Sequence, residues 1–253
     1  MATLAKKIAL VTGASGGIGR ATAVELARRG ASVGIHYFRN EKGAAETAHL
    51  VREAGGETEV LSGDLTRWED ARRVVGAVEK RFGRLDILVN NAGDMIERKP
   101  LLEMDTELWH RVFDTNVTSA FFCAQAVVPG MIERKAGAIV NLSSLAAHNG
   151  GGPGAFAYAT AKGAILSFTR GLAKELAPRG IRVNCVAPGL IDNTSFHGRF
   201  TARETFDTIA KTIPLGRAGG PEDVAQAIAF LAGDESGFLT GETIEVNGGM
   251  WMR

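Results

Sequence analysis

The chain alternates short apolar runs with longer stretches in which apolar residues recur at helical spacing. Near-continuous runs of Ile, Val and Leu are typical of strands that are covered on both faces. The runs lie at Lys7–Thr12, Ser32–Tyr37, Glu57–Ser62, Asp86–Val89, Ala138–Leu142, Arg182–Ala187 and Thr243–Val246. Amphipathic helices are predicted between them, among them Gly17–Arg29, Asp70–Phe82 and Pro221–Leu231.

The alternation of strand and helix predicts a parallel sheet with right-handed crossovers and with helices on both faces. The 253 residues of the chain are near the upper limit for one core, a length that α/β folds often reach as one domain. No Pro- or Ser-rich linker divides the sequence, and no repeat is evident. We therefore predict an α/β fold in a single domain that spans residues 1–253.

Charge and composition exclude several classes of function. The chain has 29 basic and 28 acidic residues and a net charge of +1, so no strong field attracts nucleic acid or an anionic membrane. Cys123 and Cys185 lie in apolar stretches and are expected to be buried free thiols in a reducing compartment. No Cys or His pair has metal-ligand spacing, and the first apolar run is too short for a signal peptide or a membrane span. We expect a cytoplasmic protein that binds no metal.

A glycine-rich segment, Thr12–Gly19, follows the first predicted strand directly and opens the first predicted helix. Such a segment binds the pyrophosphate of a dinucleotide: Gly13 permits a tight turn, Gly17 lets the backbone approach the phosphates, and Gly19 lets the helix pack against the strand. The helix N-terminus adds free N–H groups and a partial positive charge. A tight turn without a ligand is the alternative, but the strand–turn–helix context favours a cofactor site. The candidate residues are Gly13, Ser15, Gly16, Gly17, Ile18 and Gly19.

The end of the second predicted strand bears on the choice of cofactor. An enzyme that uses NAD usually places Asp or Glu there to accept a hydrogen bond from the ribose. The stretch Ile35–Asn40 contains no acid, and Arg39 could pair with the 2′-phosphate of NADPH through its planar guanidinium, with Ser15 adding a hydroxyl. A solvated surface arginine is the alternative. The pattern favours NADPH over NAD.

Two further loops are expected at the same edge of the sheet. Asp64 and Leu65 follow the third strand, where a carboxylate could bind the adenine amino group, could cap the next helix, or could do both. Asn91, Ala92 and Gly93 follow the fourth strand, in a loop whose small residues would let it pass close to a flat ligand. We include these residues as candidates for cofactor binding.

Tyr158 and Lys162 are four residues apart in a helical pattern, which places both on one face of the helix. A tyrosine with a pKa near 10 is a poor acid at neutral pH, and a nearby ammonium stabilises the phenolate and lowers that pKa. A Tyr-x-x-x-Lys pair is also common for structural reasons. By itself the spacing is therefore weak evidence of chemistry.

Two more polar residues are candidates for catalysis. Ser144 follows the fifth predicted strand, so it reaches the same edge as the glycine segment, where its hydroxyl could donate to a carbonyl oxygen. Both serines of Ser143-Ser144 could instead cap the following turn. Asn116 is an amide among apolar helical positions and needs partners. It could hold a water chain that leads to Lys162, or it could be a satisfied buried Asn.

Together these segments resemble the short-chain dehydrogenase/reductase family. The resemblance covers nearly the whole chain and runs, in order, through TGASGGIG, NNAG, Asn116, Ser144, YATAK, the Pro188-Gly189 turn and the closing GETIEVNGG. It implies a Rossmann-type, doubly wound, seven-stranded parallel sheet and an NAD(P)-dependent oxidoreductase that acts on CH-OH or carbonyl groups. Members of the family are usually homotetramers, so the resemblance implies a homotetramer here.

The resemblance also implies roles for single residues. Tyr158 would act as the general acid in reduction and as the base in oxidation, while Lys162 would hold the nicotinamide ribose and tune Tyr158. Ser144 would orient the carbonyl, and Asn116 would order a water in a proton relay. The nicotinamide pocket would be lined by Pro188, Gly189, Ile191 and Thr194.

The chain departs from the family pattern at two places. Thirteen residues separate Ser144 from Tyr158, where family members commonly have twelve, and we assign the extra residue to the loop 149–154. Asn193 stands where the family often has Thr, so either Thr194 shifts into that role or Asn193 takes it. Neither departure removes a catalytic group, so a non-catalytic dinucleotide-sensing protein remains only a distant alternative.

Within the family the chain is most similar to 3-oxoacyl-acyl-carrier-protein reductases, with sugar or polyol dehydrogenases as the alternative. Lys135 and Arg179 stand where acyl-carrier-protein reductases present basic residues to their acidic partner, although scattered surface cations are common. A partly aromatic substrate lid is expected at roughly residues 190–214. His148 and His197 could contact the substrate or be ordinary loop histidines.

Overall fold

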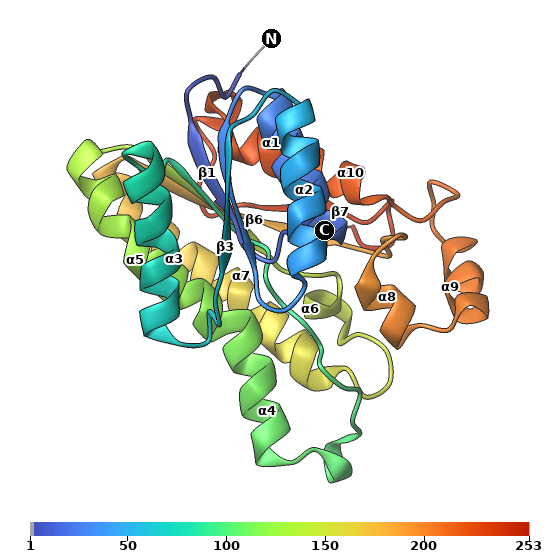
Figure 1. The fold of residues 1–253 in the computed structure, drawn as a ribbon. Coiled ribbons are helices and arrows are strands. Elements are labelled where there is room, and N and C mark those ends of the chain that lie inside the picture. Colours follow the sequence, from blue (N-terminus) through green and yellow to red (C-terminus); the bar gives the residue numbers. More distant parts are fainter. Residues whose placement is uncertain (1–2, 253) are drawn as a thin grey trace.

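The computed structural model describes residues 3–252 and shows one sheet between two layers of helices (Figure 1). The strands are β1 (Ile8–Val11), β2 (Ser32–Tyr37), β3 (Thr58–Ser62), β4 (Ile87–Asn90), β5 (Gly137–Leu142), β6 (Ile181–Pro188) and β7 (Thr243–Val246). All neighbouring pairs are parallel, in the order β3-β2-β1-β4-β5-β6-β7. The predicted single-domain, doubly wound α/β fold with seven strands is confirmed.

The helices alternate with the strands along the chain. They are α1 (Gly17–Arg28), α2 (Glu41–Glu53), α3 (Trp68–Phe82), α4 (Thr106–Phe113), α5 (Ser119–Arg134), α6 (Ala146–Asn149), α7 (Phe156–Leu176), α8 (Ser195–Phe200), α9 (Arg203–Ala210) and α10 (Pro221–Ala232). The predicted starts of α1 and α10 are confirmed, whereas α3 begins earlier than predicted, at Trp68. A π-helical turn, Asp114–Thr118, joins α4 to α5.

The central strands are mostly apolar because their side chains alternate between two hydrophobic clusters. On β1, Ala9 and Val11 belong to the cluster that includes α1, α2 and α10, while Ile8 and Leu10 belong to the cluster that includes α3, α5 and α7. Figure 1 shows α1 and α2 on one side of the sheet and α3 and α5 on the other. This double burial explains why the strands read as continuous runs rather than as alternating patterns.

The winding of the chain creates a crevice at the carboxyl ends of β1 and β4. From β1 the chain winds outward through β2 to β3, and it then crosses to β4 on the other side of β1. Open α/β sheets bind ligands outside the carboxyl ends of the strands at such a switch point. The glycine-rich turn follows β1 and the Asn91 loop follows β4, so both candidate segments meet there.

The cysteines and the lengths of the helices were also considered in the sequence. Cys123 and Cys185 are both free and buried, as predicted. None of the helices within residues 3–252 is long and apolar enough to cross a membrane.

Candidate active site

The turn after β1 has the backbone geometry that its glycines predict. Gly13 and Gly17 have φ angles of 64° and 52°, in the left-handed region that glycine adopts without strain. A Cβ on Gly19 would stand 2.5 Å from the carbonyl oxygen of Gly13 and 2.9 Å from the Cα of Ala14. The start of α1 therefore packs directly on the turn, and only a glycine leaves room for that contact.

The loop after β4 holds the glycine turn in place. The Asn91 side chain donates from Nδ2 to the carbonyl oxygens of Thr12 (2.7 Å) and Gly13 (3.0 Å). In return, the backbone N–H groups of Asn91 and Ala92 donate to Oγ1 of Thr12 at 3.0 and 2.9 Å. The sequence predicts a cofactor contact for Asn91, but the structure gives its amide nitrogen to the turn. Thr12 was not among the predicted site residues.

His36, at the end of β2, is a second residue that the sequence did not single out. Its side chain is 2% exposed and bridges two loops: Nδ1 accepts from the N–H of Gly13 at 3.1 Å, and Nε2 lies 3.1 Å from the carbonyl oxygen of Gly63. These partners require a neutral ring with its proton on Nε2. Burial is the main cause that lowers the pKa of His36 to about 4, so the ring is neutral at pH 7.

The N-terminus of α1 fits the pyrophosphate of a dinucleotide. Its N-cap is Gly16, so no side chain accepts from the first N–H groups of the helix, and the first turn contains no acidic residue. A Cβ on Gly16 would have no atom within 4 Å, which shows open space beside the helix start. Unpaired N–H groups and the helix dipole attract an anion at such a place.

We expect Gly19→Ala to impair the turn and Gly16→Ala to leave its fold intact. The new methyl at position 19 would collide with backbone atoms that cannot move independently, whereas the one at position 16 meets nothing. Overpacking of this kind costs about 1–3 kcal/mol, so Gly19→Ala should lower the free energy of unfolding by that amount. Urea unfolding measures this, and fluorescence titration with NADPH measures binding. Equal stability of the two variants would contradict the steric argument.

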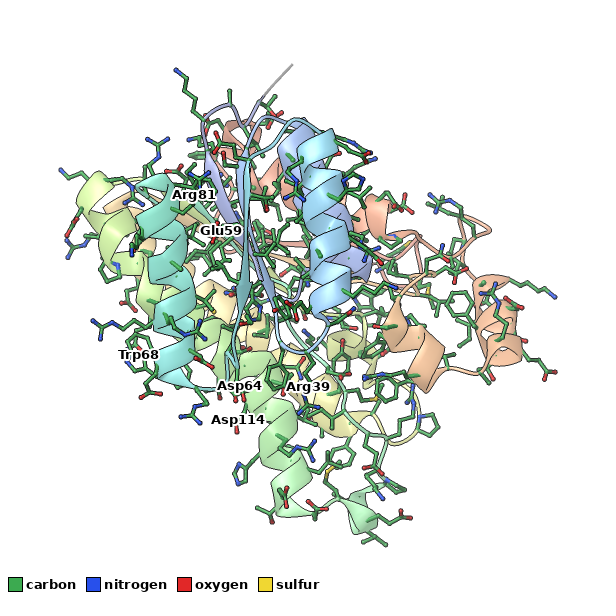
Figure 2. The ribbon with its side chains drawn as sticks, viewed as in Figure 1. Arg39, Glu59, Asp64, Trp68, Arg81 and Asp114 are labelled. Carbon is green, nitrogen blue, oxygen red and sulfur yellow. The ribbon has the colours of Figure 1, made fainter. Side chains whose placement is uncertain are left out.

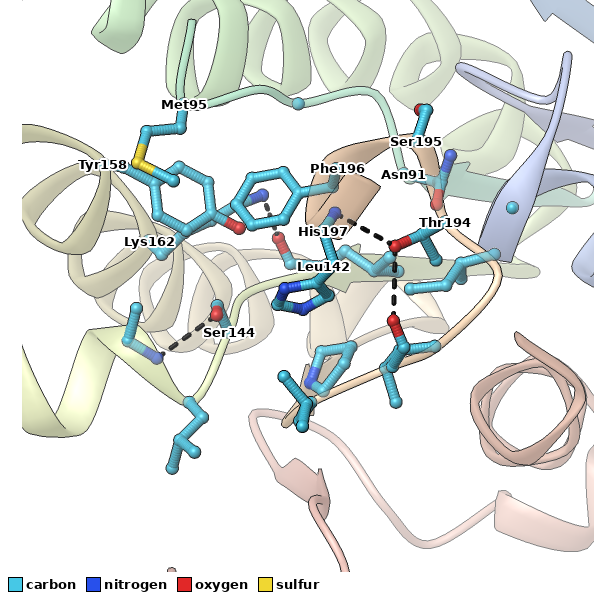
Figure 3. Close-up of a pocket in the computed structure, with 18 of the residues that line it drawn as sticks. Asn91, Met95, Leu142, Ser144, Tyr158, Lys162, Thr194, Ser195, Phe196 and His197 are labelled. Carbon is cyan, nitrogen blue, oxygen red and sulfur yellow. Dashed lines mark hydrogen bonds between the residues drawn. The ribbon is translucent and has the colours of Figure 1, made fainter. Parts of the chain in front are cut away.

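A cavity of about 660 Å³ extends from the glycine turn to α8 (Figure 3). The predicted site residues that line it are Ser15, Gly16, Gly17, Ile18, Gly19, Asn91, Gly93, Ser144, Tyr158, Lys162, Pro188, Gly189, Ile191 and Thr194. The predicted residues outside its lining are Gly13, Arg39, Asp64, Leu65, Ala92 and Asn116. The structure thus gathers the catalytic candidates, apart from Asn116, and most cofactor candidates around one cavity.

Tyr158 and Lys162 project from the same face of α7, as their spacing predicts, with the Nζ of Lys162 5.6 Å from the centre of the Tyr158 ring. Lys162 is buried, and its Nζ donates to the carbonyl oxygen of Leu142, at the end of β5, at 2.8 Å. Phe196 of α8 lies beside the Tyr158 ring, with 5.3 Å between the ring centres (Figure 3). Strand β5, helix α7 and helix α8 therefore meet at the Tyr158 side chain.

The pKa values of this pair follow from burial. Loss of solvation raises the pKa of Tyr158 to about 12, although a hydrogen bond with Ser144 acts in the opposite direction. Burial also lowers the pKa of Lys162 to about 8. The sequence-based expectation was that the ammonium would lower the pKa of the phenol, but in the chain by itself loss of solvation raises that pKa. Tyr158 therefore keeps its proton at neutral pH.

The two serines after β5 have different partners. Ser143 is buried, and its hydroxyl donates to the carbonyl oxygen of Lys162 at 2.8 Å, which ties β5 to α7. Oγ of Ser144 accepts from the N–H of Ala146 at 3.2 Å, which caps the following turn, and the same side chain lines the cavity. Ser144 therefore both caps the turn after β5, which was the alternative to a catalytic role, and lies next to Tyr158.

Asn116 lies in the π-helical turn between α4 and α5 and is 1% exposed. Its Nδ2 donates to the carbonyl oxygens of Asp94 (2.6 Å) and Val112 (2.8 Å), while its Oδ1 is buried without a hydrogen-bond partner among the residues described. Both this oxygen and the Nζ of Lys162 lie within 3 Å of the point where a Cβ on Gly93 would stand, at 2.6 and 2.9 Å. A buried acceptor of this kind suits an ordered water.

Arg39 and Asp64 lie outside the cavity lining, at the carboxyl edge of the sheet (Figure 2). Arg39 is exposed, and its guanidinium lies over the Phe38 ring at 4.7 Å from the ring centre. Asp64 accepts from the N–H and the hydroxyl of Thr66 at 3.1 and 2.7 Å. The N-cap of α3 is Arg67, so the helix-cap interpretation of Asp64 is wrong: its side chain closes a turn before the helix.

The segment 190–214 contains α8 and α9 and borders the cavity through Thr194, Phe196 and His197. Thr194 is the N-cap of α8, and its hydroxyl accepts from the N–H of His197 at 3.4 Å. Asn193 precedes it in the left-handed region, with φ at 55°, so Thr194 rather than Asn193 faces the cavity.

The two loop histidines that the sequence left open have different surroundings. His197 lines the cavity. His148 is not among the lining residues: its Nε2 lies 2.8 Å from a carboxylate oxygen of Glu245, and its ring stacks on Trp251 with 5.4 Å between the ring centres. Of the two histidines, His197 is thus the one that borders the cavity.

Comparison with known proteins identifies the family. The family described as Enoyl-(Acyl carrier protein) reductase, which is a short-chain dehydrogenase/reductase family, matches residues 13–251. The chain belongs to the short-chain dehydrogenase/reductase family. It is 38% identical to a 3-oxoacyl-[acyl-carrier-protein] reductase of Staphylococcus epidermidis, over 97% of this chain and 99% of the relative. As in the rest of this short-chain dehydrogenase/reductase family, the protein is an NAD(P)-dependent oxidoreductase that acts on carbonyl or hydroxyl groups.

Two solved structures of the same family share the fold. An NADH-dependent reductase, A1-R′, responsible for alginate metabolism is 35% identical, with a TM-score of 0.90 and 100% of both chains covered. A putative short-chain alcohol dehydrogenase from Sinorhizobium meliloti is 39% identical, with a TM-score of 0.91 and 97% of this chain and 96% of that chain covered. Their names differ, so they leave the specificity of this chain to its own site.

Proposed function

We propose that the protein reduces a carbonyl group to an alcohol with NADPH, and that Tyr158 supplies the proton. The observation that carries the proposal is the arrangement of Tyr158, Ser144 and Lys162 on a cavity that continues to the N-terminus of α1. The 3-oxoacyl thioesters are our first candidate substrates, because relatives at 38% identity over nearly the full length bear the name of 3-oxoacyl-[acyl-carrier-protein] reductase.

The reaction needs a hydride at the carbonyl carbon and a proton at its oxygen. The dihydronicotinamide supplies the hydride when it is bound. The phenol of Tyr158 is protonated at neutral pH, since its pKa is about 12, and it gives its proton to the oxygen as negative charge develops there. The hydroxyl of Ser144, beside Tyr158, donates a hydrogen bond to the same oxygen and orients it. The phenolate that remains must then regain a proton.

Lys162 and Asn116 support the return of that proton in the proposed mechanism. The ammonium of Lys162, held by the Leu142 carbonyl at 2.8 Å, stabilises the phenolate and binds the nicotinamide ribose. The unpaired Oδ1 of Asn116 holds a water near Lys162, at the end of a path for protons. Pro188, Gly189, Ile191 and Thr194 border the nicotinamide end of the cavity.

NADPH is proposed as the cofactor because Arg39 is an exposed cation at the end of β2, where the adenosine ribose binds in this fold. Arg39 makes no ion pair within residues 3–252, and its only ring contact is with Phe38, so its guanidinium is available to a 2′-phosphate. The similar reductase A1-R′ is NADH-dependent, so the choice between NADPH and NADH is tested directly.

The test is to measure oxidation of NADPH and, in parallel, of NADH with a short 3-oxoacyl thioester as the only carbonyl. We expect the wild type to prefer NADPH, and Arg39→Ala to raise the KM for NADPH about 10- to 100-fold, as for loss of a hydrogen-bonded charge pair. The KM for NADH should change less than about 3-fold, because NADH lacks the phosphate. Equal effects on both cofactors would contradict the role of Arg39.

A sugar or polyol is the second candidate substrate, favoured by the aromatic rings of Phe196 and His197 at the cavity, on which a sugar ring could stack. If neither cofactor is oxidised with the thioester, sugars and polyols should be assayed in the oxidative direction.

Residues 190–214 are proposed to form a lid over either substrate, since α8 closes one side of the cavity. Hydrogen exchange in this segment should slow when NADPH binds.

An acyl carrier protein is also a proposed partner, and the fold limits where it could dock. Lys135 and Arg179 lie just before β5 and β6, whereas Ser144 follows β5, so the two cations lie at the opposite edge of the sheet from the catalytic residues. A carrier docked on them would serve the cavity of a neighbouring subunit. Docking of this kind requires the homotetramer that we propose, for which exposed Phe121 on α5 is a contact candidate. We also propose a cytoplasmic location.

A further inference from the structure

The charged side chains that line the cavity are basic. Among the described residues that line it, several are basic and none is Asp or Glu. Arg20 is held by α2, through hydrogen bonds to Glu46, Thr47 and the carbonyl oxygen of Gly43. Lys162 belongs to the proposed catalytic group. This leaves Arg98, at the substrate end beside α8, as a cation that the proposed mechanism does not use.

The backbone fixes Arg98 firmly in its place. Its Nε donates to the carbonyl oxygen of Phe200, at the end of α8, at 3.1 Å, and its Nη1 donates to the carbonyl oxygen of Pro153 at 2.9 Å. The neighbouring N–H of Lys99 donates to the carbonyl oxygen of Gly154 at 3.0 Å, which holds the two loops together. Three segments that enclose the substrate end therefore position one guanidinium.

The guanidinium retains binding capacity. Its partners are two neutral carbonyl oxygens, so its charge has no counterion within residues 3–252, and none of the hydrogen bonds described uses its Nη2. Gly152 has no side chain to crowd the guanidinium: a Cβ there would stand 3.4 Å from Nη1 and 3.9 Å from Nη2. A fork of N–H donors with no anionic partner is suited to a planar carboxylate.

The carboxylates of the surrounding elements do not neutralise this charge. Asp94, on the same loop as Arg98, pairs with Arg199 of α8, and Asp192 pairs with Arg203 at 3.2 Å. The pKa of the nearby His197 is lowered, mainly by burial and further by the charge of Arg98, so this ring is neutral at pH 7. Within residues 3–252, Arg98 is therefore a cation at the substrate end without a carboxylate partner, and one carboxylate of a ligand would balance its charge.

We infer that Arg98 determines specificity by binding a carboxylate of the carbonyl substrate. The inference rests on the proposed carbonyl reduction and narrows its substrate class. It is compatible with both skeletons considered above, since an acyl chain can end in a carboxylate and a sugar can be a sugar acid. Recognition of the charge by a residue outside the reacting group would act mainly on KM.

Matched substrates test the inference. We would compare 4-carboxybenzaldehyde with methyl 4-formylbenzoate, and 4-oxopentanoate with its methyl ester, at saturating NADPH. The wild type should show a kcat/KM at least about 10-fold higher for each acid, and Arg98→Gln should lower that value about 10- to 100-fold, mainly through KM. The esters should change less than about 3-fold, and Arg98→Lys should restore part of the preference.

Arg199→Gln is the matched control. Arg199 pairs with Asp94 and ties α8 to the same loop, but it does not line the cavity, so its loss loosens α8 and keeps the cation of Arg98. We expect acids and esters to be affected equally in this variant. If Arg98→Gln also affects acids and esters equally, Arg98 is only a structural tie and the inference is overturned. The inference is also overturned if the wild type shows no preference for the acids.

A binding measurement separates this inference from the proposed reaction. Terephthalate carries no reducible carbonyl, so calorimetric titration of the NADP⁺-loaded protein reports recognition without turnover. The wild type should bind it about 10-fold more tightly than Arg98→Gln does. Equal affinities overturn the inference. If the esters are turned over and the acids are not preferred, the role of Arg98 is overturned and carbonyl reduction is kept. If terephthalate binds tightly and no carbonyl is turned over, the proposed reduction is contradicted and the role of Arg98 is kept.

Discussion

Tyr158→Phe should lower kcat for carbonyl reduction about 10³-fold, because the variant loses the only group proposed to protonate the developing alkoxide. The ring and its contact with Phe196 at 5.3 Å are kept, so packing around α7 and α8 should not change. Steady-state rates of NADPH oxidation measure the loss, and the free energy of unfolding should stay within about 1 kcal/mol of the wild type.

Cofactor binding by the same variant distinguishes an enzyme from a dinucleotide sensor. The N-terminus of α1 and the glycine turn do not depend on the phenol, so NADPH should bind to Tyr158→Phe with nearly wild-type affinity in a fluorescence titration. Ser144→Ala, which removes the neighbouring hydroxyl and keeps the phenol, serves as the companion variant and should lower kcat about 10²-fold. Wild-type turnover by Tyr158→Phe would refute the proposed mechanism.

His36 should make the protein labile to mild acid. In the folded chain its pKa is about 4, against 6.5 for an unperturbed histidine, so the unfolded state binds the proton first as the pH falls. Stability from this neutral ring is present above about pH 6.5 and is lost as the pH falls to about 4. The difference corresponds to about 3 kcal/mol in the free energy of unfolding.

Urea unfolding at a fixed protein concentration, between about pH 7 and pH 4, measures this effect, with His36→Gln as the reference without a titrating ring. The acids whose pKa is lowered, such as Asp223 with a pKa of about 2, lose their contribution at lower pH. The pKa of His197 is also lowered, but His197 is present in both proteins, so the difference between their pH slopes reports His36. The variant should lack most of the decline between pH 6.5 and 4 that the wild type shows. An equal pH slope in both proteins would show that His36 is not responsible.

A pair of substitutions separates the two hydrogen bonds of His36. An Asn side chain places its oxygen where Nδ1 accepts from Gly13, whereas a Gln side chain places its nitrogen where Nε2 faces Gly63. Since Gly13 belongs to the glycine turn, His36→Asn should retain more affinity for NADPH than His36→Gln does. Equal losses in the two variants would mean that the bridge to Gly13 does not position the turn.

Much of the fold followed from local patterns. The predicted strands at Ser32–Tyr37 and Thr243–Val246 match β2 and β7 to the residue, because short runs rich in β-branched and aromatic residues favour strands. The start of α1 at Gly17 followed from the glycine segment, and the start of α10 at Pro221 from a proline at the first helical position. These signals lie within a few residues of the element that they specify.

The hydrogen-bond partners of the polar side chains were harder to predict from the sequence, because many of them come from distant parts of the chain. Asn91 lines the cavity as a cofactor candidate, and its Nδ2 donates to Thr12 and Gly13, which are far away in sequence. No spacing rule connects these residues, since two strands and three helices lie between β1 and β4. The turn that Asp64 closes with Thr66 is local, but whether Asp64 would close a turn or cap the helix depended on where α3 begins.

The sequence by itself determined the family, the sheet and the set of catalytic candidates, because each of these depends on periodicity or on an ordered series of short motifs. Only the tertiary structure decided which groups are buried and what faces them. It made His36 a neutral bridge, raised the pKa of Tyr158 to about 12, and left Arg98, at the substrate end, as a cation with no counterion among residues 3–252. Desolvation and hydrogen-bond pairing are properties of the packed chain, and a residue's own sequence neighbours do not specify them.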